Sequence, residues 1–107
     1  MKLKWTVPAA MQLENIYHFY SQKSVEAATN IYNDIIDEVD RLIVFPEMAA
    51  VEPVLADYTH IYRSLIVRKL FKVVYRIEDK TIFIVAVFDC RQDPQKLLSF
   101  VLGSDCQ

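Results

Sequence analysis

The stretch "YRSLIVRKLFKVVYRIEDKTIFIVAVFD", residues 62–89, decides the fold of this chain. Its runs of β-branched and aromatic residues predict strands at about 58–67, 70–77 and 81–89. If "EDK" forms a loop of two or four residues, Ile77 faces Ile82 across a hairpin. The further predicted pairs are Tyr75–Ile84, Val73–Ala86 and Phe71–Phe88. These pairs give one wholly apolar face, on which helices can pack.

The opposite face of the predicted hairpin is apolar in its middle and basic on top. It presents Lys72, Val74 and Arg76 against Val87, Val85 and Phe83. A long apolar central strand needs cover on both faces, and one layer of helices covers only one. We therefore expect the second face to be a docking surface for a partner. Residues 62–77 hold five cations and no acid, so this surface is expected to be basic.

The rest of the chain adds one strand and two helices. "KLKWTV" (2–7) reads as a short strand, and Pro8 suits the first turn of a helix over about 9–22. Ser24 is the expected N-cap of a second helix that runs to about Phe45, with a loop over 46–57. We expect one α+β domain, 1–107, with a helical hairpin on one face of a mostly antiparallel sheet.

Composition excludes several classes of protein. The chain has 107 residues, a formal net charge of −2 and a single glycine, so it has no glycine-rich phosphate loop. Its longest apolar run, Ile82–Phe88, is too short to span a membrane, and the N-terminus lacks the apolar core of a signal peptide. Two cysteines without paired histidines predict neither a disulfide framework nor a metal site. We expect a cytoplasmic protein without a cofactor.

Charge is divided unevenly along the chain. Residues 1–60 carry 4 Lys or Arg against 9 Asp or Glu, whereas residues 61–107 carry 8 against 5. Such asymmetry indicates an acidic or polyanionic partner for the second half. Its cations Arg63, Lys72, Arg76 and Arg91 converge on one region if the three strands are neighbours, and clustered cations of this kind bind phosphate. The alternative is an ordinary solvated strand face.

Other residues are weaker candidates for chemistry. His60, three residues before Arg63, is a weak candidate for a general acid or base. His18 and Cys90 are expected to be structural. Aromatic residues at helical spacing are expected in the core or between the helices: Tyr17, Tyr20, Tyr32 and Phe45.

The order and spacing of "YRSLIV", "FKVVYRI" and "TIFIVAVFDCRQDPQKL" resemble the RelE/ParE superfamily of toxins. These are the toxin halves of type II toxin–antitoxin, or plasmid stabilisation, systems. The resemblance covers nearly the whole chain and implies the fold already described. It also implies a cognate antitoxin whose C-terminal segment wraps the toxin.

The superfamily divides by target. RelE-like members cut mRNA on the ribosome with a set of basic residues and, in some, a tyrosine, whereas ParE-like members inhibit DNA gyrase and lack that set. By the resemblance, Arg63, Lys72 and Arg91 occupy basic positions of the nuclease set. Leu65 occupies the position of a lysine of that set, and Leu97 occupies the position of the tyrosine. Neither leucine can bind phosphate or transfer a proton, which favours ParE-like action.

We therefore expect a ParE-like toxin that binds and inhibits gyrase and is neutralised by its antitoxin. Two alternatives remain: a RelE-like ribosome-dependent endoribonuclease, in which Arg63, Lys72 and Arg91 would be catalytic, and a non-toxic antitoxin-binding member. Whether the chain is an enzyme is left open, as is its assembly as a homodimer or as a hetero-oligomer with antitoxin. The expected residues for antitoxin or target binding are Arg63, Lys72, Arg76, Arg91, Phe83 and Val85.

Overall fold

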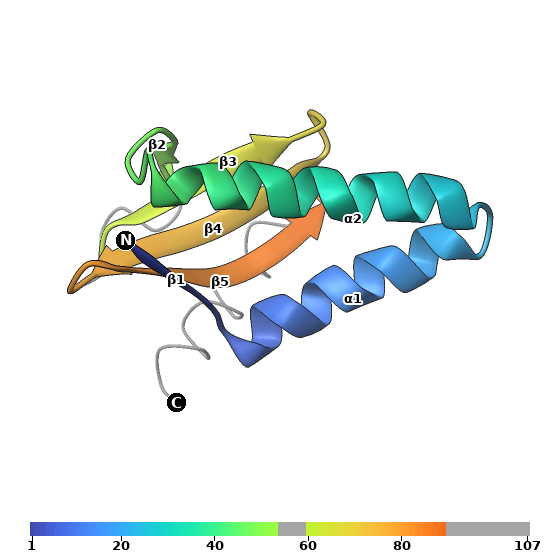
Figure 1. Cartoon of the computed structure of the whole chain (residues 1–107), viewed down its shortest axis with the longest axis horizontal. Helices are drawn as coiled ribbons and strands as arrows, with labels where there is room; N and C mark the ends of the chain where they lie inside the picture. Colours follow the sequence, from blue (N-terminus) through green and yellow to red (C-terminus); the bar gives the residue numbers. More distant parts are fainter. Residues whose placement is uncertain (54–59, 90–107) are drawn as a thin grey trace.

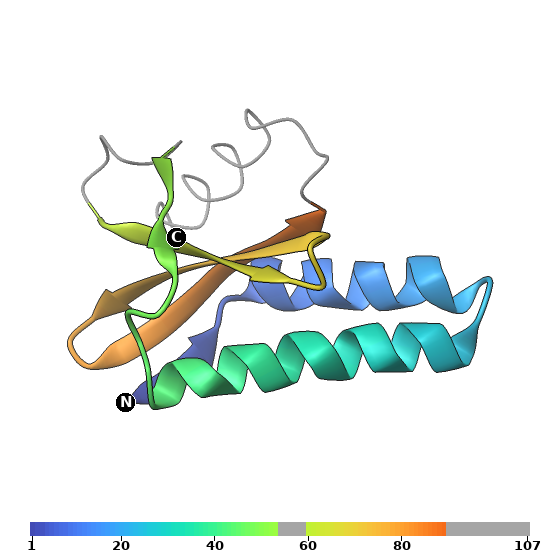
Figure 2. The same ribbon diagram turned by 90° about the horizontal axis from the view of Figure 1, so that it is seen from above.

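A helical hairpin covers one face of a five-stranded sheet in the computed structural model, which describes residues 1–53 and 60–89. Its elements are β1 (Lys2–Trp5), α1 (Val7–Ser21), α2 (Val25–Asp40), the 3₁₀ helix η1 (Arg41–Ile43), β2 (Ala50–Val51), β3 (Tyr62–Val67), β4 (Phe71–Glu78) and β5 (Thr81–Asp89). The strand order is β1-β5-β4-β3-β2, with β1 parallel to β5 and the other neighbours antiparallel. Both helices lie on the same side of the sheet (Figures 1 and 2), which confirms the predicted α+β architecture.

Capping residues fix where both helices begin. Thr6 caps α1 by accepting a hydrogen bond from the Ala9 backbone N–H, and its hydroxyl also donates to the Ile84 carbonyl at 2.9 Å. This residue thus ties the start of α1 to β5. Pro8 lies in the first turn of α1, and Ser24 caps α2 through the Ala27 N–H at 3.1 Å, both as predicted. No helix in the described part of the chain is long and apolar enough to span a bilayer.

Two predicted boundaries between α2 and β3 are wrong. The α-helix ends at Asp40 rather than near Phe45, because the chain tightens into η1, where the Val44 N–H donates to the Arg41 carbonyl. The predicted loop over 46–57 contains β2, a two-residue strand paired with β3. Two residues are too few to show an alternating pattern, so only their pairing with β3 identifies them as a strand.

The β4–β5 hairpin follows the predicted register only as far as a β-bulge. The pairs Ile77–Ile82 and Tyr75–Ile84 are confirmed. The next paired residue of β5 is Ala86, opposite Val74, so Val85 is an extra residue in the strand. The predicted pairs beyond this point are therefore wrong: Val73 faces Val87, and Phe71 faces Asp89.

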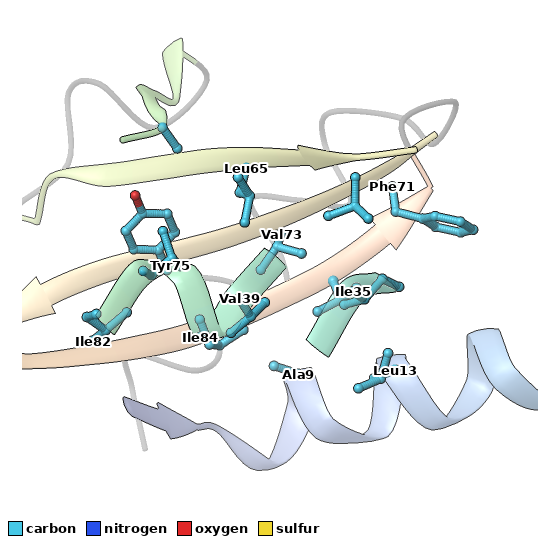
Figure 3. Packing of buried hydrophobic residues seen from close by; sticks show 14 of the residues in the cluster. Ala9, Leu13, Ile35, Val39, Leu65, Phe71, Val73, Tyr75, Ile82 and Ile84 are labelled. Atoms are coloured by element: carbon cyan, nitrogen blue, oxygen red, sulfur yellow. The ribbon is translucent and has the colours of Figure 1, made fainter. Parts of the chain in front are cut away.

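The bulge changes which β5 side chains face the helices. Val87 joins the helix-side core with Val73, Tyr75, Ile82 and Ile84, which pack against both helices (Figure 3). A second buried cluster lies on the other face and contains Tyr62, Val74, Val85, Ala86 and Phe88. Without the extra residue, Val87 would face away from the helices and Phe88 toward them.

The turn between β4 and β5 generates a stability prediction. Glu78 pairs with Thr81, so Asp79 and Lys80 form a two-residue loop, and both have positive φ, 50° and 64°. Glycine adopts this conformation without the cost that a Cβ imposes. We expect Lys80→Gly to raise the free energy of unfolding by about 0.5–1 kcal/mol, measured by urea denaturation. Lys80→Ala, which removes the charge but keeps a Cβ, is the control and should not stabilise; equal gains in both variants would contradict the backbone explanation.

Candidate functional site

The cations of β3 and β4 lie on two different faces of the sheet. Arg63 pairs with Tyr75, whose ring belongs to the helix-side core, so Arg63 faces the helices. Lys72 and Arg76 alternate with Tyr75 along β4 and face the other way. The prediction that these cations converge on one region is therefore wrong for Arg63.

Arg63 stabilises the segment that follows α2. Its Nη1 donates to the Ala49 carbonyl at 2.8 Å, and the neighbouring Tyr75 hydroxyl donates to the Pro46 carbonyl at 2.8 Å. Burial raises the pKa of Tyr75 above its ordinary value of 10.0, although the positive charge of Arg63 acts in the opposite direction. The two side chains hold the 46–49 backbone over the edge of the sheet, which is a structural role for Arg63.

Lys72 is paired with a buried carboxylate. Its Nζ lies 3.0 Å from Oε2 of Glu52, a residue that is only 1% exposed. The Ser64 hydroxyl donates to the same carboxylate oxygen, and the Glu52 backbone N–H donates to the Tyr62 carbonyl at 2.8 Å. Buried carboxylates persist in proteins when cations and hydrogen-bond donors compensate their lost hydration, and Lys72 and Ser64 supply both here.

The other cations of this segment also have contacts with the rest of the chain. The Arg76 guanidinium lies over the Phe83 ring, 4.9 Å from its centroid, and its Nε is 3.4 Å from a carboxylate oxygen of Glu78. Arg68, in the turn after β3, forms an ion pair with Asp34 of α2. Two cations of the basic segment 62–77, Arg68 and Lys72, are therefore paired with acids from other parts of the chain, and Arg76 is paired within its own strand.

The middle of the second face is not an open docking surface. Val74, Val85 and Ala86 are each 0% exposed. Val85 is buried in this structure, and its contact with a partner stays a prediction. The bulge places Ala86 on this face beside Val85, and both belong to one buried cluster with Tyr62. Phe83 is only partly buried and remains beside Arg76 at the end of this cluster.

The remaining candidates that lie within the described residues contribute little to a catalytic site. The His60 ring contacts Tyr62 edge-on at 6.1 Å between centroids, and Leu65 is buried in the helix-side core. Phe45, expected in the core, is 58% exposed. Arg91, Cys90 and Leu97 lie outside the described residues. Across 1–53 and 60–89, no group of three or more His, Cys, Asp or Glu residues could hold a metal ion.

Sequence reasoning missed Glu52, the residue that organises this polar cluster. It lies in the predicted loop over 46–57, and loops are normally solvated. The available signal was its position in "AAVEPVLA", where a single acid stands among apolar residues. Chemically, this arrangement is a set of ion pairs and contact surfaces. The basic side chains described above are already bound to acids or to a backbone carbonyl.

Comparisons with known proteins agree with this fold. A family model described as the ParE toxin of the type II toxin–antitoxin system, parDE, matches residues 3–94. A solved chain from the chromosomal ParDE TA system of P. aeruginosa is 28% identical with a TM-score of 0.70, and the alignment covers 83% of this chain and 95% of that chain. No curated protein matches the sequence.

The buried ion pair can be tested by a double-mutant cycle. We expect Lys72→Met to lower the free energy of unfolding by about 3 kcal/mol, because it removes the positive charge that Lys72 places beside the buried Glu52 carboxylate. Replacing both residues, Glu52→Gln with Lys72→Met, should recover most of this loss. Urea denaturation measures each value, and Lys69→Met in the exposed turn is the control. If the single and double variants are equally stable, the pairing does not explain the burial of Glu52.

Because of Tyr75, we expect the free energy of unfolding to fall in alkali. Its folded-state pKa is raised, so the unfolded chain releases the phenolic proton first as the pH rises above about 10. The contribution of Tyr75 to stability is therefore complete below that pH and is lost as the pH rises toward the folded-state pKa. Tyr75→Phe should cost about 1 kcal/mol at neutral pH through the lost bond to Pro46, and should reduce this alkaline loss. Parallel alkaline profiles for the two proteins would contradict the assignment.

Proposed function

Because this chain belongs to the ParE toxin family of type II toxin–antitoxin systems, we propose that it inhibits DNA gyrase by direct protein–protein contact and is neutralised by a cognate antitoxin. The observation that carries this proposal is the placement of Arg63 and Lys72 on opposite faces of the sheet. We propose the cytoplasm as its site of action, since gyrase acts there.

Cleavage of RNA requires several groups at one phosphodiester. Cations must stabilise the charge that develops on the phosphate, and another group must move a proton. Here Arg63 binds the Ala49 carbonyl on the helix side, whereas Lys72 binds Glu52 on the other side. Leu65, at a basic position of the nuclease set, is buried. These features support a toxin that acts by contact rather than by catalysis.

The antitoxin contact proposed here is narrower than the sequence suggested. Arg76 and Lys72 keep 15% and 24% of their side chains exposed on the second face, and Phe83 lies under Arg76. We propose that acidic and apolar side chains of the antitoxin approach this pair of cations, so that binding weakens at high salt. Arg63 and Val85 are no longer part of the proposed contact.

A supercoiling assay tests the main proposal. Purified protein added to gyrase and relaxed plasmid should reduce supercoiling in proportion to its concentration, and an equimolar amount of antitoxin should restore it. A toxin that acts by contact needs no turnover, so inhibition should depend on its ratio to gyrase. The measurement is the fraction of supercoiled plasmid on an agarose gel.

The controls separate the other members of the superfamily. The same preparation should leave ribosome-bound mRNA intact. Full gyrase activity together with cut mRNA would identify a ribosome-dependent nuclease instead. Full gyrase activity, intact mRNA and tight antitoxin binding would identify a non-toxic antitoxin-binding protein. Either result would overturn gyrase inhibition.

A further inference from the structure

The two helices enclose a groove along the hairpin. Among the described residues, its lining includes Glu14 and Tyr17 from α1 and Thr29 and Tyr32 from α2. Its volume is about 300 Å³, and it is open to solvent. In each helix the lining residues are three apart, so they share a face beside the one that contacts the sheet. The paired helices that form it run side by side in Figures 1 and 2.

Two aromatic rings and one carboxylate define the chemistry of this groove. The Tyr17 and Tyr32 rings meet edge to face, 6.0 Å apart at an interplanar angle of 82°, and both side chains are partly buried. The face of an aromatic ring attracts a cation by its quadrupole, and more strongly where water is partly excluded. Glu14 adds a full negative charge, with 64% of its side chain exposed.

Positive charge is scarce around the groove. The basic side chain paired with Glu14 is His18, whose Nε2 lies 3.8 Å from a Glu14 carboxylate oxygen, and it is not a permanent cation like Lys or Arg. Between residues 7 and 40 the sequence holds six Asp or Glu, one Lys and no Arg. The helical hairpin therefore produces a negative potential that attracts cations toward its surface.

We propose that this groove binds an arginine side chain presented by a partner protein. A guanidinium is planar and weakly hydrated, so it can stack on a tyrosine ring while it donates hydrogen bonds to a carboxylate. Both groups stand in the same groove here. A lysine ammonium is more strongly hydrated and cannot stack, so it fits this combination less well. The site lies on the helices, away from the cations of the sheet, and does not depend on gyrase being the target.

The probe for this site is N-acetyl-L-arginine amide, which carries the side chain without a partner's other contacts. Titration into the folded protein, followed by NMR, should give saturable shifts of the Tyr17 and Tyr32 ring protons. We expect a dissociation constant in the millimolar range, because one exposed cation–π contact and one exposed ion pair are weak. N-acetyl-L-citrulline amide, neutral and nearly the same shape, should give no saturable shift.

Variants of the protein decide whether these four residues form the site. Glu14→Gln and Tyr32→Leu should each weaken arginine binding about two- to five-fold. The control is Glu26→Gln, an equal loss of charge on α2 outside the groove, which should leave binding unchanged. Glu14 is well exposed, so its variant remains informative even if Tyr32→Leu disturbs the hairpin.

Three results would overturn the proposal. Equal shifts with citrulline would show that charge is not recognised. An equal loss in Glu26→Gln and Glu14→Gln would show a diffuse electrostatic effect rather than a site. Tighter binding of N-acetyl-L-lysine amide than of the arginine probe would show that the site is not selective for guanidinium.

Discussion

The pairing of β4 with β5 supports every other part of this structure, and the bulge at Val85 is its main constraint. These two strands form the centre of the sheet, with β1 parallel to β5 and β3 on the other side of β4. The extra residue shifts the register by one, so Val87 enters the core under the helices and Phe88 enters the cluster on the other face. Both faces of the central strands thereby receive large apolar side chains, and the sheet is buried on both sides.

Burial on both sides explains how an acidic protein accommodates a basic strand. Lys72 of β4 is only partly solvated, and an acid distant in sequence, the buried Glu52, binds it. Such a buried pair adds little net stability compared with apolar packing, but losing one partner is costly. The pair of Arg68 in the turn with Asp34 of α2 is about half exposed and contributes less. The two pairs therefore fix the position of β2 and of the β3–β4 turn rather than leave free cations for phosphate chemistry.

Stability and recognition consequently depend on different layers of the molecule. Much of the sheet's charge is used internally, and among the described residues the cations Lys72 and Arg76 are partly accessible on its second face. The hairpin uses its apolar stripe for the core, and the groove between its helices is lined by two partly buried tyrosines and the Glu14 carboxylate. In the two proposals above, these surfaces of opposite charge meet different partners.

The sequence by itself determined the α+β class, the helix cap at Ser24, the place of Pro8 in the first turn of α1, and the hairpin register next to the turn. These features depend on contacts within a few residues, which local patterns record. Only the tertiary structure decided the bulge at Val85, the strand β2, the burial of Glu52 and the separation of Arg63 from Lys72. A one-residue bulge leaves no mark in an alternating apolar run, yet it reverses the face of each residue beyond it. A two-residue strand and a buried acid exist only because a distant strand pairs with one and a distant lysine with the other.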